Sequence, residues 1–257
     1  MPVHPDARHA AQMVNDLGLV RLGTAFFRRA LDQLDDAELD APSLLSGWSR
    51  RHLVAHVGYN ARAVARLVSW ADTGAENPMY ASPRARAEEI DFGATLAPAA
   101  LRHLIEHSAI DLDVRWRDLP ANRWSFVVRT AQGRQVPVAQ TLWMRTREVW
   151  LHAVDLRSGA QVEQVPVPVL RRLVGDVHAA WTTRGTGTGL VLQTTDGPVP
   201  AAWGAADPGR PDSLDTVTVT GSTPDLAAWA TGRMDPARWE KYLDWSGGAP
   251  RPAPHWI

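Results

Sequence analysis

Residues 138–156 carry a line of ionisable side chains between apolar borders, and this pattern strongly limits how the chain can fold. Spacings of four, three, four and three residues place these side chains on one face of a helix. Because buried charge is costly unless it is paired or bound to a metal, we expect this polar stripe to face the inside of a helical bundle. The stripe consists of Thr141, Arg145, Glu148, His152 and Asp155.

Two chemical interpretations of the polar stripe are open. Glu148 and His152 are four residues apart, so on a helix their side chains project in nearly the same direction and can bind one metal ion. Alternatively, the stripe is a salt-bridge seam in which Arg145 neutralises Glu148 and Asp155. The first interpretation requires a further ligand from another part of the chain.

Residues 50–71 offer that ligand. They are expected to form a helix that begins after Ser49, a typical N-cap residue, and that carries His52 and His56. His56 borders the apolar stripe of this helix, whereas His52 lies further round, towards solvent. A lone histidine at such a border is more often a core-edge residue bonded to a carbonyl. With the ligand pair of the polar stripe on another inward face, we predict that His56 binds metal and that His52 does not.

Composition excludes several classes of protein. The formal net charge is −1, so the chain lacks the basic surface expected of a nucleic-acid-binding or membrane-binding protein. Lys241 is the sole lysine, which we attribute to codon bias. No apolar run reaches the length of a membrane span, and the first residues lack a signal-peptide core. The absence of cysteine excludes disulfides, and we expect a cytoplasmic protein.

The pattern of helices predicts a four-helix bundle followed by a smaller domain. We expect a loop at 77–91 and a β-hairpin around Gln132-Gly133. Trp143 and Trp150 point away from the polar stripe and are expected to pack against the second domain. The four bundle helices are expected at residues 6–34, 50–71, 96–119 and 138–156.

A change of composition at 158–168 marks a linker, so we predict domains at 1–160 and 161–257. The second is expected to be a small α+β domain. Thr223 is the expected N-cap of its last helix, with Pro224 in the first turn. Its elements are expected to be helices at 169–181 and 224–231 and strands at 189–195 and 216–220.

Three segments of the chain form recognisable motifs. They are LLSGWS at 44–49 with His56-Val57-Gly58 and Asn60-Ala61, EVWLHAVDL at 148–156, and residues 220–233. In this order they resemble the second-helix motif, the later metal motif and the C-terminal domain of the mycothiol-dependent maleylpyruvate isomerase family. The resemblance extends over nearly the whole chain.

The resemblance implies a DinB-like bundle and a C-terminal α+β domain similar to sterol carrier folds. It further implies zinc bound by His56, Glu148 and His152, with mycothiol, the thiol of actinobacteria, as the second cofactor. Arg86, in the loop after the second helix, would bind cofactor and substrate. Asp155 lies one helical turn beyond His152 and is expected to take part in cofactor binding by orienting a ligand imidazole.

The expected reaction is the cis-trans isomerisation of maleylpyruvate to fumarylpyruvate in gentisate degradation, by thiolate addition, rotation and elimination. Arg233 of the second domain is the other expected catalytic arginine, because a guanidinium suits the carboxylates of the substrate. Two alternatives remain open: a mycothiol S-transferase acting on other electrophiles, and a non-catalytic zinc-binding module in which His52 supplies a fourth ligand. We expect only small-molecule partners and a monomer or weak dimer.

Overall fold

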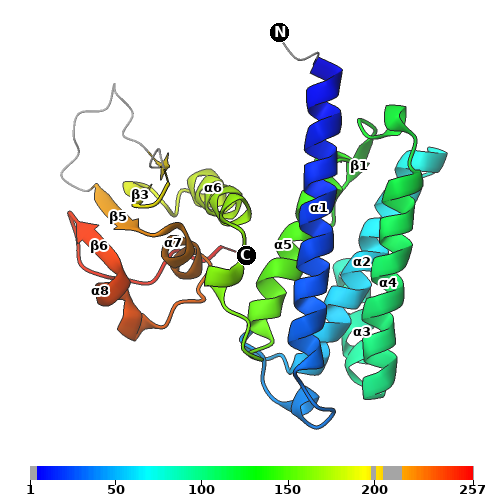
Figure 1. The fold of residues 1–257 in the computed structure, drawn as a ribbon, viewed down its shortest axis with the longest axis horizontal. Coiled ribbons are helices and arrows are strands. Elements are labelled where there is room, and N and C mark those ends of the chain that lie inside the picture. Colours follow the sequence, from blue (N-terminus) through cyan, green and yellow to red (C-terminus); the bar gives the residue numbers. More distant parts are fainter. Residues whose placement is uncertain (1–4, 198–200, 205–215, 257) are drawn as a thin grey trace. The chain divides into compact units, whose positions relative to one another are not determined.

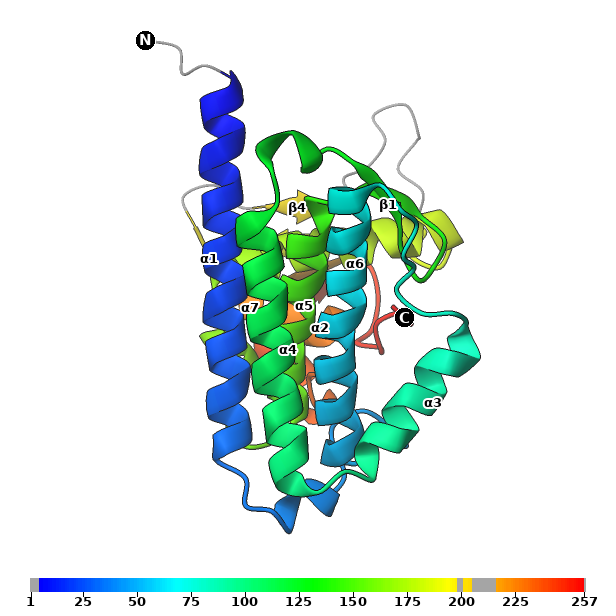
Figure 2. The same ribbon diagram turned by 90° about the vertical axis from the view of Figure 1, so that its right-hand side faces the viewer.

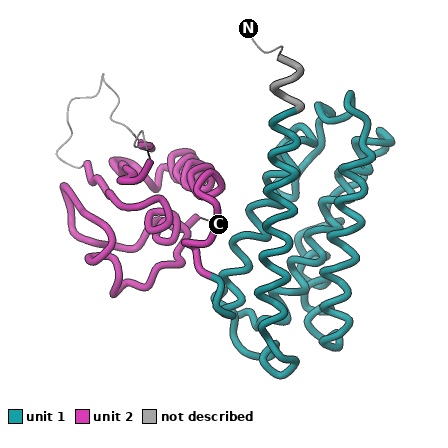
Figure 3. Tube along the Cα trace, viewed as in Figure 1, with its two compact units in different colours: residues 1–160 teal, residues 161–257 magenta. Residues whose placement is uncertain are grey.

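The computed structural model describes residues 5–197, 201–204 and 216–256. Its chain folds into two compact units, residues 1–160 (unit 1) and 161–257 (unit 2), coloured separately in Figure 3. Unit 1 is built mainly from helices, with one short β-hairpin, and unit 2 combines helices with a small sheet (Figure 1). The predicted fold class is confirmed. In the described part of the chain, no helix is both long enough and apolar enough to span a membrane.

Unit 1 contains the predicted four-helix bundle, seen side-on in Figure 2. Short 3-10 helices, η1 (Glu38–Asp40) and η2 (Ala121–Arg123), lie in its connections. The predicted hairpin is confirmed as strands β1 (Val127–Arg129) and β2 (Gln135–Pro137), which pair antiparallel. The bundle helices are α1 (Pro5–Asp32), α2 (Arg50–Thr73), α4 (Pro98–Asp118) and α5 (Gln140–Asp155).

The central helix of the bundle, α2, has well-defined ends and an almost wholly buried middle. The Ser49 side chain accepts a hydrogen bond from the backbone of His52, and Gly74 ends the helix with a left-handed φ of 79°. A Cβ atom at Gly58 would lie 2.6 Å from Leu104 Cγ of α4. Glycine at this position therefore lets α2 and α4 pack closely.

The expected loop at 77–91 is wrong in its second half, where α3 (Pro83–Ala94) forms. Ser82 caps this helix by accepting a hydrogen bond from Ala85, and proline stands in its first turn. Only Ile90 and Gly93 of α3 are buried, so the helix has little of the apolar periodicity that marks the others. Ser82 and the proline after it were the sequence features that could have predicted this helix.

Unit 2 packs helices against a four-stranded sheet of order β4-β3-β5-β6, in which β3 and β5 are parallel and the outer pairs antiparallel. The predicted N-cap of α7 is wrong by one residue, because Ser222 rather than Thr223 accepts the hydrogen bond from Asp225. The strands are β3 (Leu190–Thr194), β4 (Ala202–Trp203), β5 (Val217–Gly221) and β6 (Leu243–Ser246). The helices are η3 (Val162–Gln164), α6 (Val167–Arg184), α7 (Thr223–Ala230), η4 (Pro236–Arg238) and α8 (Trp239–Tyr242).

Trp150 does not take the partner expected from the sequence. Its ring packs on Phe26 of α1 with 5.0 Å between ring centroids, and its Nε1 donates a hydrogen bond to the carbonyl of Leu19. The expectation that this side chain packs against the second domain is therefore wrong, because the outer face of α5 is covered by α1.

Candidate metal centre

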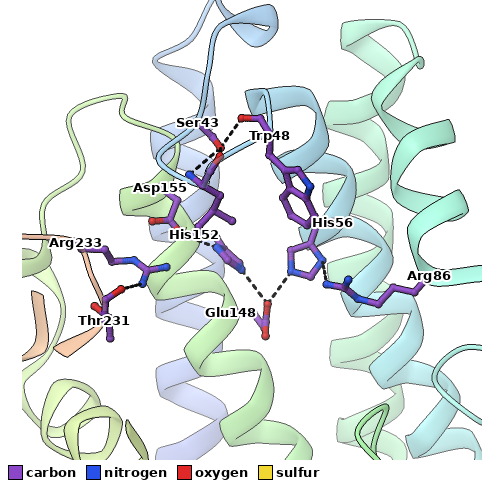
Figure 4. A network of polar contacts seen from close by, with 10 residues as sticks. Ser43, Trp48, His56, Arg86, Glu148, His152, Asp155, Thr231 and Arg233 are labelled. Atoms are coloured by element: carbon purple, nitrogen blue, oxygen red, sulfur yellow. Dashed lines mark hydrogen bonds and ion pairs between the residues drawn. The ribbon is translucent and has the colours of Figure 1, made fainter. Parts of the chain in front are cut away.

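Three potential metal ligands from two helices converge inside unit 1 (Figure 4). His56 lies on α2, whereas Glu148 and His152 lie one turn apart on α5. Glu148 Oε2 lies 3.1 Å from the Nε2 atom of each histidine. One ligand atom of each residue lies within 4.8 Å of the others, and no other such group occurs among the described residues. The structure thus joins the three residues that the sequence singled out; below they are called the ligand cluster.

Burial and a fourth side chain hold the ligand cluster in place. His56 is buried, and the side chains of Glu148 and His152 are 18% and 12% exposed. Asp155 is fully buried, and its Oδ2 lies 2.8 Å from His152 Nδ1. This contact orients the imidazole so that Nε2 faces the cluster, as carboxylates commonly do for metal-bound histidines.

Hydrogen bonds and burial together set the protonation of the ligand cluster. Burial lowers the pKa of His56, and its interactions with Glu148 only partly offset this effect. Burial alone would raise the pKa of Glu148, yet hydrogen bonds from His152 and His56 hold that pKa well below its usual value. Burial would lower the pKa of His152, but Asp155 and Glu148 outweigh it and raise this pKa to about 8. At neutral pH, His152 must therefore lose a proton before it can bind a metal ion.

Arg145 does not form the salt-bridge seam that was the alternative interpretation. Its Nη1 donates hydrogen bonds to the carbonyl of Val57 at 2.7 Å and to Asn60 Oδ1 at 3.0 Å. Glu148 instead contacts the two histidines, and no ion pair joins it to Arg145 within the described part of the chain. The structure therefore favours the metal-site interpretation of the polar stripe.

Arg86 lies beside the ligand cluster because α3 forms. It occupies the first turns of this helix, and its Nη2 lies 3.3 Å from His56 Nδ1. The Arg86 guanidinium also lies 6.0 Å from the ring centre of Tyr80, which Arg66 approaches at 5.7 Å. This side of the cluster thus carries two guanidinium groups around one phenol. Arg66 also pairs with Glu89 at 3.7 Å, so Arg86 is the group better suited to bind an anion.

His52 lies outside the ligand cluster, as the sequence predicted, and so does Arg84. His52 Nδ1 lies 2.7 Å from Ser49 Oγ at the start of α2, and this residue is not part of the cluster. The side chain of Arg84 is 87% exposed and pairs with Glu88 one turn away on α3. A closed four-ligand site that includes His52 therefore has no support in the described geometry.

The donor set fits a divalent metal ion. Two imidazole nitrogens and one carboxylate are a common ligand set of catalytic zinc, which keeps a coordination position open. Glu148 places one carboxylate oxygen between the two histidines, where its negative charge offsets the charge of a cation. Nitrogen and oxygen donors bind several divalent ions, so this ligand set indicates a divalent metal site without selecting one metal.

Comparison with known proteins identifies the family of this chain. Residues 20–157 match the family model described as the mycothiol maleylpyruvate isomerase N-terminal domain. The chain is also 46% identical to the mycothiol-dependent maleylpyruvate isomerase of known crystal structure, with a TM-score of 0.85, over 95% of this chain and 97% of that one. This chain belongs to the mycothiol maleylpyruvate isomerase family. The same identity, coverage and TM-score hold for a histidine-to-alanine mutant of that enzyme. Comparison with curated proteins gives no match.

Membership of the mycothiol maleylpyruvate isomerase family covers both units, because the matched structure spans nearly the whole chain. Arg233 lies in unit 2, three residues beyond the end of α7 and directly after Gly232, whose φ is 72°. Its Nη1 donates a hydrogen bond to the carbonyl of Thr231 at 2.9 Å. The catalytic role of Arg233 stays a prediction.

Tyr80 and Arg66 are the neighbours of the ligand cluster that sequence reasoning missed. Arg66 lies on α2, and its guanidinium bonds to the carbonyl of Met79, which holds the chain before α3 against the bundle. The available signal was the helical spacing of Arg66 from the histidine motif, ten residues after His56. A solvent-exposed arginine on the same helix can have the same spacing, so the sequence could not distinguish an arginine beside the cluster from one on the surface.

Proposed function

We propose that this protein is a metal-dependent and mycothiol-dependent cis-trans isomerase that converts maleylpyruvate to fumarylpyruvate. The observation that carries the proposal is the convergence of His56, Glu148 and His152 in a chain 46% identical to such an isomerase. In the proposed reaction the thiolate adds to the cis double bond, the resulting single bond rotates, and elimination returns the thiol and the trans product. No atom is gained or lost overall.

The ion, which we propose is zinc, would lower the pKa of the thiol so that a thiolate is available at neutral pH. The chain's own residues would hold and surround the reactants. His56, Glu148 and His152 would supply the protein ligands, and Asp155 would keep the His152 ring oriented. Three protein ligands leave a position for an exchangeable group, which supports a catalytic site over a closed structural one.

Arg86 is the proposed partner of a substrate carboxylate. A neutral imidazole whose Nε2 binds metal carries its proton on Nδ1, and that nitrogen then accepts no hydrogen bond from a guanidinium. Loading of the site would therefore release Arg86 from His56 and leave its donors available to an anion. We propose Arg233 as the second arginine for the dianionic substrate, on the strength of the family resemblance.

We also propose that the enzyme works in the cytoplasm, because a reaction that needs a free thiol requires a reducing compartment. Its place would be in gentisate breakdown, in an actinobacterial host that makes mycothiol. No macromolecular partner is proposed, and a monomer or weak dimer suffices for the reaction.

The test is an absorbance assay of maleylpyruvate conversion by zinc-loaded protein, with and without mycothiol. We expect conversion that depends on mycothiol, with the thiol recovered intact. A stable mycothiol conjugate would instead identify an S-transferase. A protein that retains zinc but shows no response to the thiol would contradict catalysis altogether and support a zinc-binding module.

A further inference from the structure

Unit 1 contains a cavity of about 390 Å³ that the proposed isomerase reaction does not use. It lies between α1 and α4, which run side by side in Figure 2, and no member of the ligand cluster lines it. Much of its lining is apolar, including Val20, Leu112 and Trp116. Its volume lies within the range of small-molecule sites.

One member of the lining is a buried cation. Arg145 reaches the cavity from α5, although the residue is only 1% exposed. Its Nη1 is held by Val57 and Asn60, whereas Nε and Nη2 have no hydrogen bond to any described residue. No carboxylate in the described part of the chain forms an ion pair with Arg145, and Glu148 is engaged by the histidines.

This burial makes the guanidinium receptive to an anion. A buried charge is costly unless it is paired, because the surrounding protein solvates it poorly. Burial lowers the pKa of Arg145 to about 10, even though the charges of Glu148 and Tyr80 oppose this shift. A single negative charge placed in the cavity would offset part of that cost, and a planar guanidinium suits a carboxylate in particular.

The charged side chains at the rim of the cavity form ion pairs of opposite charge. Arg21 of α1 pairs with Asp113 of α4 through two hydrogen bonds of 2.7 and 3.2 Å, and Arg28 pairs with Glu106 at 3.3 Å. These pairs bridge the two helices at the surface, and the third rim arginine, Arg117, pairs with the neighbouring Asp118 at 2.8 Å. The ligand that fits carries one negative charge for Arg145 and a short apolar body for the remaining lining.

We propose that the cavity between α1 and α4 binds a small aliphatic monocarboxylate, with its carboxylate on Arg145 and its hydrocarbon chain against Val20, Leu112 and Trp116. This site is separate from the ligand cluster and does not depend on the isomerase proposal.

The test uses pentanoate as the probe and 1-pentanol as a neutral control of the same chain length. Binding to the full-length protein, metal-free and zinc-loaded, is measured by calorimetry and by saturation-transfer NMR. We expect pentanoate to bind in both forms and at least about tenfold more tightly than pentanol, the effect of one hydrogen bond to a charged group. Equal binding of the two probes would overturn the role of Arg145.

Variants locate the site. Ala109→Trp fills the cavity from α4 and should weaken pentanoate binding at least about tenfold, whereas Ala99→Trp, on the exposed side of the same helix, should not. Arg145→Lys keeps the charge but loses the planar fork, so weaker binding is expected with the fold retained. Arg86→Ala, at the ligand cluster, should leave the affinity for pentanoate unchanged. If Arg86→Ala removes binding and Ala109→Trp does not, the carboxylate binds beside the ligand cluster and the proposal is wrong.

Discussion

Metal binding to the ligand cluster should release about one proton at pH 7. The pKa of His152 is raised to about 8, so about nine-tenths of the metal-free molecules carry a proton on its imidazole at this pH. A metal ion needs the Nε2 lone pair, so that proton must leave. The pKa values of His56 and Glu148 are both lowered, so neither residue has a proton to release.

The size of the effect on affinity follows from the same pKa. Displacing the proton at pH 7 raises the apparent dissociation constant about tenfold, and this penalty vanishes above about pH 9. The same shift stabilises the metal-free fold by about 2 kcal/mol relative to an unperturbed histidine. Because the folded pKa is raised, this contribution is fully present below pH 6.5 and is lost as the pH rises through 8.

Calorimetric titration of zinc in buffers of different ionisation enthalpy measures the released protons. NMR titration of His152 in metal-free protein gives its pKa directly and separates this proton from one lost by metal-bound water. Asp155→Asn should lower that pKa and weaken metal binding by about 10-fold to 100-fold, whereas Asp72→Asn, at an exposed site on α2, should do neither. An ordinary pKa of 6.5 for His152 in wild-type protein would refute the reasoning.

Three further results are expected. His56→Ala should abolish metal retention measured by elemental analysis, while His52→Ala should leave it intact; the reverse would overturn the ligand assignment. Arg233→Ala should leave the metal bound but lower kcat/KM for maleylpyruvate by about 100-fold, and unchanged kinetics would remove this arginine from the reaction. Gly58→Ala should destabilise the fold by about 1–3 kcal/mol in urea unfolding, because its Cβ would lie 2.6 Å from a leucine of α4. Gly18→Ala, which meets no atom within 4 Å, should stabilise α1 by up to about 1 kcal/mol, so equal effects would contradict the packing argument.

Helical periodicity explains why the bundle and its ligand cluster were predictable. A polar stripe between apolar borders is expected to face the interior of a helical bundle. The spacing of Glu148 and His152 is a local property of one helix. The border position of His56 on α2 follows equally from local spacing. These predictions required no knowledge of which helices are neighbours.

Helical periodicity did not predict α3 or the position of Arg86. With Ile90 and Gly93 as its buried residues, α3 has almost no apolar pattern, and its formation depends on its cap and on contacts with α2. Sequence therefore treated 77–91 as a loop and could not place Arg86 beside His56. The short partner strands of unit 2, β4 and β6, were missed because two to four residues carry too little periodic signal.

The sequence by itself determined the helical class of unit 1, the α+β class of unit 2 and the identity of the three residues in the ligand cluster, because these depend on composition and on spacing within single helices. Only the tertiary structure decided which side chains of other helices contact the polar stripe of α5. Glu148 contacts His56 across ninety-two positions of the chain, and Arg145 bonds to Asn60 rather than to its own-helix carboxylates. Which side chains meet across helices depends on packing and desolvation, and these are properties of the assembled bundle.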